Sequence, residues 1–349
     1  MSIIKKIFGA IVGVLVLVGI YHHELVSYGY QQAKGQLRIL WNTRPVSEVL
    51  IDPTFPDSLK TRLRLIAEIK QFAIDSLGLK DSDSYTTFYD QQGKPILWVI
   101  TASEKYRLMA KEWSFPFIGT FAYKGFFDTL QLQKEEKQLI KEGYDTQISE
   151  VAAWSTLGFF KDPVLSSMLL RSEGSLANLI IHEMTHGTLF IKDNLELNEN
   201  LASFVGDFGA IQFLKAKYGN DSPELETYLF RQRYHEAFGQ HILRGARQLD
   251  SLYQSFSVLT PTREKEHLKK LMIEQIMAAS DTLLGGQVGK KSPWRSTKLP
   301  NNAFFIGYLT YRAQQNQFQQ EFEQKFKGDL KNYIRYLKNK YGQSGNVSI

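Results

Sequence analysis

The segment from position 178 to position 187 decides what kind of fold this chain needs, and it reads Asn178-Leu179-Ile180-Ile181-His182-Glu183-Met184-Thr185-His186-Gly187. It contains the pattern H-E-x-x-H. On a helix, residues four positions apart lie on one face, so His182 and His186 can bind one metal ion. Glu183 lies about 100° around the helix axis from His182, where it can lean toward an open coordination position. The segment therefore predicts a helix that presents a metal site.

The residues around the pattern favour the same interpretation. Between positions 178 and 189 there is no proline, and no charge apart from Glu183 and any protonated histidine. A buried helix is expected to have this composition. The alternative is a helix with two structural histidines and a surface glutamate. That alternative leaves unexplained why two of the chain's 7 histidines fall within one helical turn.

The third ligand is predicted from the next helical pattern. A catalytic zinc site generally has three protein ligands and one water. Glu199 begins a second helical stretch after a predicted turn, and Ala202 is small enough for the two helices to pack closely. Glu196, in the turn, is the rival ligand, and Glu199 can also serve as an acidic residue at a helix N-terminus. We predict one zinc ion per chain, held by His182, His186 and Glu199.

These residues imply a hydrolytic mechanism. Bound zinc acidifies an attacking water, and Glu183 is placed to take the proton and pass it to the leaving amine. Tyr308 and Tyr311 are candidates to stabilise the developing oxyanion. Aromatic residues at helical spacing are more often part of a core, so that role stays open for both. Asn301 and Asn302, just before them, can cap the following helix.

Hydropathy periodicity predicts an α+β fold, with a small antiparallel or mixed sheet followed by a mainly helical body. Residues 58–76 form the first predicted helix, and 85–89 and 96–101 are predicted strands of one hairpin across the turn 90–94. Two further extended segments are expected around 118–127 and 148–155. The later helices are expected at 176–190, 199–218, 224–254, 262–284, 303–314 and 321–341.

Composition excludes several functional classes. The chain has 349 residues, a net charge of +6 and no cysteine. Disulfides, thiolate catalysis and thiolate-bound zinc are therefore excluded. The basic residues are scattered, which argues against nucleic acid as a partner. A stretch near the C-terminus, 325–340, is the most basic and is expected to be a solvated helix face.

The N-terminus predicts a membrane anchor. Lys5 and Lys6 precede an uncharged apolar run, 7–21. The run is shorter than the roughly 20 residues that span a bilayer comfortably, but flanking lysines can snorkel. A cleaved signal peptide is the alternative, although no small-x-small site follows the run. We expect a single-pass signal anchor over 1–23, with one catalytic domain over 24–349 on the non-cytoplasmic, periplasmic side.

The paired motifs carry a resemblance. H-E-x-x-H with N-E-x-x-A resembles the gluzincin metallopeptidases, which include aminopeptidase N and thermolysin, although the loop between the motifs is shorter here. A longer match is to a bacterial family of membrane-associated aminopeptidases. Family members often carry a lipoprotein cysteine, which is absent here. The segments that are similar are 35–37, 44–46, 123–127, 143–145, 155–158 with 162–165, and 301–303.

The resemblance implies a zincin-like catalytic body and an aminopeptidase activity on peptides. Gluzincins often place a sheet edge beside the zinc, where substrate adds as a strand. This makes Glu150 a candidate to bind the substrate's amino terminus, and Ala153 and Trp154 candidates to contact the peptide. Where thermolysin-type enzymes have a carboxylate four residues after the ligand glutamate, this chain has Ser203, and Asp207, one turn further along, can substitute as the acceptor for a histidine ligand.

Three functions compete at this stage. The first is an anchored zinc aminopeptidase acting outside the cytoplasm. The second is an anchored endopeptidase that cleaves envelope proteins, which an open groove would favour. The third is a membrane-tethered binding protein that keeps a degenerate peptidase fold. The presence of both histidines, the candidate base and a third ligand favours an enzyme.

Overall fold

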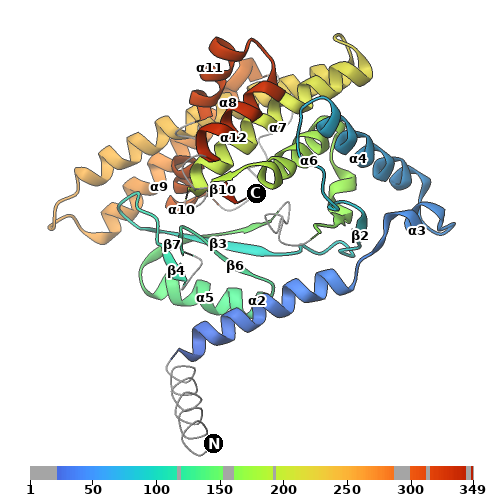
Figure 1. Cartoon of the computed structure of the whole chain (residues 1–349). Coiled ribbons are helices and arrows are strands. Elements are labelled where there is room, and N and C mark those ends of the chain that lie inside the picture. Colours follow the sequence, from blue (N-terminus) through green and yellow to red (C-terminus); the bar gives the residue numbers. More distant parts are fainter. Residues whose placement is uncertain are drawn as a thin grey trace, which may run out of the picture.

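The computed structural model describes residues 22–115, 119–151, 161–191, 194–286, 299–311, 315–342 and 347–348. It is mostly helical with small sheets, as Figure 1 shows. Three layers stand out in that view. A central sheet separates the helical body from two helices on its other side, α2 (His23–Trp41) and α5 (Thr129–Lys141).

The central sheet has the strand order β6-β3-β7, with β3 (Trp98–Glu104) between β6 (Lys124–Phe126) and β7 (Tyr144–Glu150). Both pairings are antiparallel. Ile100 and Ala102 alternate with more exposed residues along β3, as expected for a strand with one buried face. They form a small core with Leu132 and Leu139 of α5 and with other residues.

The predicted hairpin between 85–89 and 96–101 is wrong. The turn exists, with Gln92 and Gly93 at positive φ. However, β2 (Thr87–Tyr89) pairs antiparallel with β1 (Arg44–Pro45) and parallel with β8 (Val164–Leu165), whereas β3 belongs to the central sheet. Phe88 packs into the large core near α4 and Ile100 into the core under α5. The core in which each strand buries its side chains therefore decides which sheet the strand joins.

The helical body holds the candidate site. Its largest core joins α4 (Asp57–Asp75), α6 (Glu173–Thr188) and α7 (Leu195–Tyr218). A second core lies among the long helices that follow. The remaining elements are α3 (Val46–Ile51), α8 (Pro223–Gln254), α9 (Thr262–Ala279), α10 (Asn302–Tyr311), two 3-10 helices (Ser166–Leu170 and Ser280–Gly286), and the paired short strands β4 (Trp113–Phe115) with β5 (Gly119–Phe121) and β9 (Phe190–Ile191) with β10 (Val347–Ser348).

The single helix expected at 321–341 is two helices, α11 (Gln315–Phe326) and α12 (Leu330–Gly342). Lys327 and Gly328 between them adopt positive φ, which ends α11 and redirects the chain. Tyr333 of α12 is fully buried and donates a hydrogen bond to Glu321 of α11. The hydropathy pattern continues across the break because both helices bury one face in the same core. Three helices, α2, α3 and α5, were not predicted at all.

Motifs that carried the family resemblance meet in space. Gly35 of α2 lies where a Cβ atom would collide with the ring of Phe127, so only glycine lets α2 approach this closely. Tyr28 of α2 donates a hydrogen bond to the carbonyl of Gly125 at 2.9 Å. Burial raises the pKa of Tyr28 to about 12, so its phenol stays a donor. The segments 35–37 and 123–127 thus hold α2 against β6.

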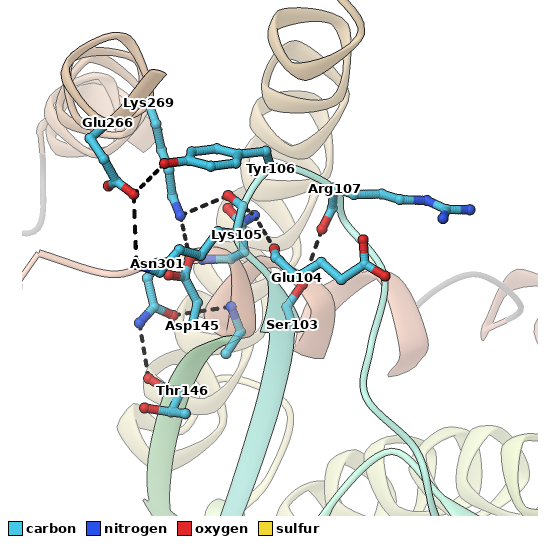
Figure 2. Close-up of polar contacts among 12 residues, drawn as sticks. Ser103, Glu104, Lys105, Tyr106, Arg107, Asp145, Thr146, Glu266, Lys269 and Asn301 are labelled. Atoms are coloured by element: carbon cyan, nitrogen blue, oxygen red, sulfur yellow. Dashed lines mark hydrogen bonds and ion pairs between the residues drawn. The ribbon is translucent and has the colours of Figure 1, made fainter. Parts of the chain in front are cut away.

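A buried polar network joins two more of these motifs (Figure 2). Lys269 of α9, 5% exposed, forms an ion pair with Asp145 of β7. The backbone N–H of Asn302 donates to the same carboxylate at 3.0 Å, and its side chain donates to the carbonyls of Glu104 and Lys105. Asn301 donates to the carbonyl of Thr146. The network fixes α9 and α10 to the central sheet.

The predicted anchor over 1–23 falls almost wholly on residues 1–21, outside the described residues. Within the described ranges, no helix combines the length and the apolar character needed to cross a bilayer.

Candidate metal centre and cleft

Helix α6 presents the pair of histidines. Its apolar face, including Leu176, Ile180 and Ile181, is fully buried in the large core. Arg62 of α4 fixes the start of the helix through hydrogen bonds to Glu173 and to the carbonyl of Leu169. With that face buried, the face bearing His182 and His186 points toward α7, and their imidazole rings lie edge to face with centroids 4.9 Å apart.

Asn198 determines where α7 begins and how Glu199 is aimed. Its side chain, 1% exposed, accepts a hydrogen bond from the Ile191 N–H at 2.8 Å and donates to the Ile191 carbonyl at 2.7 Å. Asn194 caps the helix through the N–H of Leu197. The helix therefore starts at Leu195, four residues before the predicted start. Glu196 lies inside it rather than in a turn, and its side chain is outside the described part of the chain.

Small residues let the two helices cross closely. A Cβ atom on Gly206 would lie 3.2 Å from the Cβ of His182 and 3.0 Å from the carbonyl oxygen of Asn178. At Gly209 it would meet the side chain of Ile181 at 2.9 Å. Ala202, one turn before Gly206, is fully buried. The close approach brings the carboxylate of Glu199 to the histidines.

The three predicted ligands converge. The Nε2 atoms of His182 and His186 are 3.2 Å apart. One carboxylate oxygen of Glu199 lies 3.5 Å from Nε2 of His182, and the other lies 3.5 Å from Nε2 of His186. Among the described residues this is the group of histidine, aspartate and glutamate side chains that can hold a metal ion.

This triangle fits a tetrahedral ion. Ligands at about 2.0–2.1 Å from zinc in tetrahedral geometry lie roughly 3.3 Å from one another. The two Nε2 atoms are 3.2 Å apart, and each lies 3.5 Å from a different carboxylate oxygen of Glu199, so a small shift of the carboxylate would bring one oxygen into this range. Two imidazoles and one carboxylate are also a known ligand set of catalytic zinc. His186 is 4% exposed, whereas the side chain of Glu199 is 32% exposed, so the triangle is open on one side. The donor set and its geometry therefore suit zinc with an accessible position.

The protonation of two of the three groups, His186 and Glu199, suits metal binding, whereas a metal at His182 would have to displace a proton. Burial and the nearby His182 lower the pKa of His186 to about 4, which keeps its imidazole neutral. Burial lowers the pKa of His182, but the hydrogen bond to Glu199 and the charge of Glu183 outweigh it, so the pKa is raised overall. Burial raises the pKa of Glu199, but the two histidines outweigh it and the net pKa is lowered. A neutral imidazole and an ionised carboxylate are the forms that bind metal.

Glu183 follows His182 on α6, its charge acts on that histidine, and it also lines a cleft. The cleft has a volume of about 280 Å³ and is bordered by α6 and by two loops, with the lining residues Lys80, Ser82, Asp83, Ser84, Tyr85, Lys161, Asp162, Glu183, Met184 and Gly187. The candidate base is thus accessible to a molecule in the cleft. Met184, the next residue along the helix, also borders the cleft but is largely buried.

Tyr85 in this cleft was not singled out by sequence analysis. Its φ is 67°, a left-handed conformation that is strained for a bulky side chain. Its N–H donates to the Asp162 carbonyl at 2.7 Å, and the Asp162 N–H donates to the Ser84 hydroxyl at 3.2 Å. Burial and the negative charges of Glu183 and Asp162 raise the pKa of Tyr85 well above its usual value. The phenol is therefore a protonated donor held near two carboxylates.

Asp207 supports the histidine side of the site. Its carboxylate accepts hydrogen bonds from Asn178 at 2.9 Å and from the Tyr228 hydroxyl at 2.8 Å. Its charge contributes to the raised pKa of His182. Asn178 and Tyr228 thus fix Asp207 where its charge acts on His182.

The other predicted site residues are less closely associated with this centre. Glu150 is exposed at the end of β7, opposite Trp98, and Ala153 and Trp154 lie outside the described residues. Tyr308 of α10 packs against Phe238 and Phe304, as expected for a core aromatic residue. Tyr311 is the last residue of α10, and its side chain is outside the described part.

Tyr123 is a second residue that sequence analysis left without a role. It precedes β6 and packs against Phe121 with ring centroids 5.8 Å apart. Burial and the charge of Glu199 raise its pKa, so its phenol lies within electrostatic range of the ligand triangle. Tyr123 belongs to the segment 123–127, which carried the family resemblance. The motif alone, however, does not predict which groups the tyrosine side chain approaches.

The centre and the cleft together define a candidate hydrolase site on a helical body with small sheets. The model of one family, described as "Putative aminopeptidase", matches residues 27–343. The chain belongs to this family. No curated protein and no solved structure matches it.

Proposed function

We propose that the protein is a zinc-dependent aminopeptidase. The observation that carries this proposal is the convergence of His182, His186 and Glu199, whose ligand atoms lie within 4.8 Å of one another, with Glu183 next to His182 on the same helix. The family match supports a peptidase. The metal and the mode of cleavage are inferred from the side chains.

When bound, zinc would supply a Lewis acid that polarises the peptide carbonyl and acidifies the attacking water. Glu183 accepts the proton of that water and delivers it to the leaving amine. The Tyr85 phenol, which stays protonated, orients the Glu183 carboxylate or the substrate in the cleft. The negative charge of Asp207 near His182 would favour the binding of a cation by that histidine.

The size of the cleft favours an exopeptidase over an endopeptidase. Ligand pockets generally have volumes of about 300–1,000 Å³, and the cleft, at about 280 Å³, lies just below that range. It suits the end of a short peptide better than a long extended segment. Glu150 remains our candidate to bind the substrate's amino group. We also keep the proposal that residues 1–23 anchor the chain in the membrane, with the catalytic body on the periplasmic side.

The first experiment pairs metal content with a substitution at Glu183. The full chain is purified without chelators in mild detergent, and zinc is counted per chain in the wild type, in Glu183→Gln and in a control, Glu226→Gln, whose carboxylate is exposed on α8. Hydrolysis of free aminoacyl substrates, N-acetylated peptides and internally quenched peptides is then compared. We expect near one zinc in all three proteins and a loss of about 100- to 10,000-fold in activity only for Glu183→Gln.

The substrates separate the competing functions. Preference for a free amino terminus supports an aminopeptidase, whereas equal cleavage of N-acetylated or internal bonds supports the endopeptidase. If the wild type binds no zinc, the proposal is wrong. If it binds zinc but hydrolyses none of the substrates, the membrane-tethered binding protein takes its place.

A further inference from the structure

The outer face of α2 is an exposed apolar stripe. Val26, Tyr30, Leu37 and Trp41 are 56%, 64%, 40% and 78% exposed. Their spacings of four, seven and four residues place them on one face of the helix. A single exposed apolar residue is ordinary, but a row along a whole helix indicates a partner surface.

The orientation of this stripe is fixed by the opposite face of α2. Tyr28 and Gln32 both donate hydrogen bonds to the Gly125 carbonyl, at 2.9 and 3.0 Å. The Tyr28 ring stacks on Phe115 and meets Phe126 edge to face. Gly35 lies against the Phe127 ring. Because α2 is docked along its inner face, the exposed stripe lies on the face turned away from the body. Helix α2 itself lies below the central sheet in Figure 1.

The chain context and the charges indicate what covers the stripe. The apolar run 7–21 directly precedes α2, and Lys5 and Lys6 precede the run. Lys34 and Arg38 are exposed on α2 to one side of the stripe. Tyrosine and tryptophan concentrate at the interface between lipid and water, and basic residues beside an apolar face bind anionic headgroups. This combination is typical of a helix that lies in the plane of a bilayer surface.

We propose that α2 lies on the surface of a lipid bilayer, with the apolar stripe at the boundary of headgroups and acyl chains and with Lys34 and Arg38 at anionic headgroups. Such helices bury their apolar face by about 5–10 Å. The rigid docking of α2 on β6 then sets the orientation of the whole body. In Figure 1 helix α6 lies on the other side of the central sheet from α2, so the metal-binding helix is held away from the lipid.

The absence of cysteine allows a direct test in the full chain. Single cysteines are introduced as Val26→Cys and Leu37→Cys on the stripe, and as Gln320→Cys on the exposed face of α11 at the opposite edge of Figure 1 as the matched control. Each variant carries an environment-sensitive fluorophore and is reconstituted into vesicles of phosphatidylcholine and phosphatidylglycerol. Quenching by aqueous iodide and by brominated lipid is measured.

We expect iodide to quench the labels at 26 and 37 roughly threefold less than the label at 320, and brominated lipid to quench only the two on the stripe. Stripe labels that iodide quenches as strongly as the control would overturn the proposal. Protection in lipid-free solution, with disulfide-linked dimers through residue 37, would also overturn it and assign the stripe to a second copy. The readout needs no peptidase activity, so it stands even if the proposed function fails.

Discussion

Two polar clusters lie inside this protein and differ in how completely their members are paired. In the network around Asp145 and Lys269 (Figure 2), the ammonium, the carboxylate and the amide of Asn302 all find partners. At the candidate metal centre, the side chains of His182, His186 and Glu199 converge. There Nδ1 of His186 and Nδ2 of Asn200 are buried with no hydrogen-bond partner among the described residues.

The difference teaches how a structural cluster can be told from a functional one. Buried polar groups are normally paired, so a paired network costs little and fixes neighbouring elements in place. Converging ligand atoms with unpaired neighbours make sense when a metal or a substrate completes the site. We therefore expect substitutions in the network around Asp145 and Lys269 to lower the free energy of unfolding. Substitutions at the candidate metal centre should instead lower metal binding and catalytic activity.

The largest expected effect is at the metal centre. His186→Ala removes one of three ligands, and we expect zinc to fall to background and activity to fall by more than about 1,000-fold, because both depend on the same ion. The matched control is His267→Ala, which removes an exposed histidine of α9. Elemental analysis and a peptide assay on both variants test this. Full zinc content in His186→Ala would remove His186 from the ligand set.

The next effect concerns the buried network. Lys269→Met leaves the Asp145 carboxylate buried beside Asn302 without its cation, which is expected to cost about 3–5 kcal/mol of folding free energy. The neighbouring Lys270 pairs with Glu274 at the surface, so Lys270→Met is expected to cost about 0–1 kcal/mol. Denaturant unfolding of the two variants measures the contrast.

Zinc content separates the two clusters in the same experiment. At temperatures where Lys269→Met is folded, we expect it to keep the zinc of the wild type. Loss of zinc from the folded variant would show that the network also supports metal binding. The distinction between a structural and a functional cluster would then be wrong.

A smaller effect is expected at Asp207. Groups that orient metal ligands generally change metal affinity by about 10- to 100-fold, and Asp207 acts on His182 through its charge. Asp207→Asn should therefore weaken zinc binding within that range while the ligands remain. Tyr228→Phe, which removes only the hydroxyl that donates to Asp207, should weaken it less. Competition titration with a zinc-binding dye ranks the two, and the reverse order would contradict this role of Asp207.

The sequence could predict that His182, His186 and Glu199 meet, because the pattern is local. His182 and His186 share a helix turn, and Glu199 follows at the next helix, so helical geometry alone brings two of the three together. It could also predict α4, α6 and α8 to within a few residues, since each has a periodic apolar face. The α+β class and the zincin-like body remain proposals, because they depend on how distant elements assemble.

Long-range pairing could not be predicted in the same way. The turn at 90–94 has the residues of a hairpin, but β2 pairs with β8, some 75 residues later, because both bury side chains in the same core. Tyr85 gave no signal, since neither its left-handed backbone nor the cleft appears in a hydropathy pattern. The hydrogen bond from Asn302 to Asp145 could not be predicted either, although both positions lie in motifs that carried the family resemblance.

The smallest expected effect is at Tyr85, and it tests most specifically whether a buried residue serves structure or function. It is as deeply buried as a core residue, at 8% exposure, yet it lines the cleft with Glu183 and keeps a strained backbone. Strain of this kind persists where the surrounding structure enforces it, and it concentrates at functional sites. If Tyr85 served only to fill the core, removing its hydroxyl would affect stability and leave catalysis unchanged.

Tyr85→Phe removes the hydroxyl and keeps the ring. A hydrogen bond typically contributes about 0.5–1.5 kcal/mol, and somewhat more when it reaches a charged group, so we expect kcat to fall by about tenfold while zinc content stays the same. Tyr89→Phe makes the same change on β2, outside the cleft, and should leave kcat unchanged. Steady-state kinetics with one aminoacyl substrate compares the two. Equal kcat values, or a loss of thermal stability in Tyr85→Phe without a change in kcat, would place Tyr85 with the structural cluster instead, because a hydroxyl that serves catalysis must act on the rate.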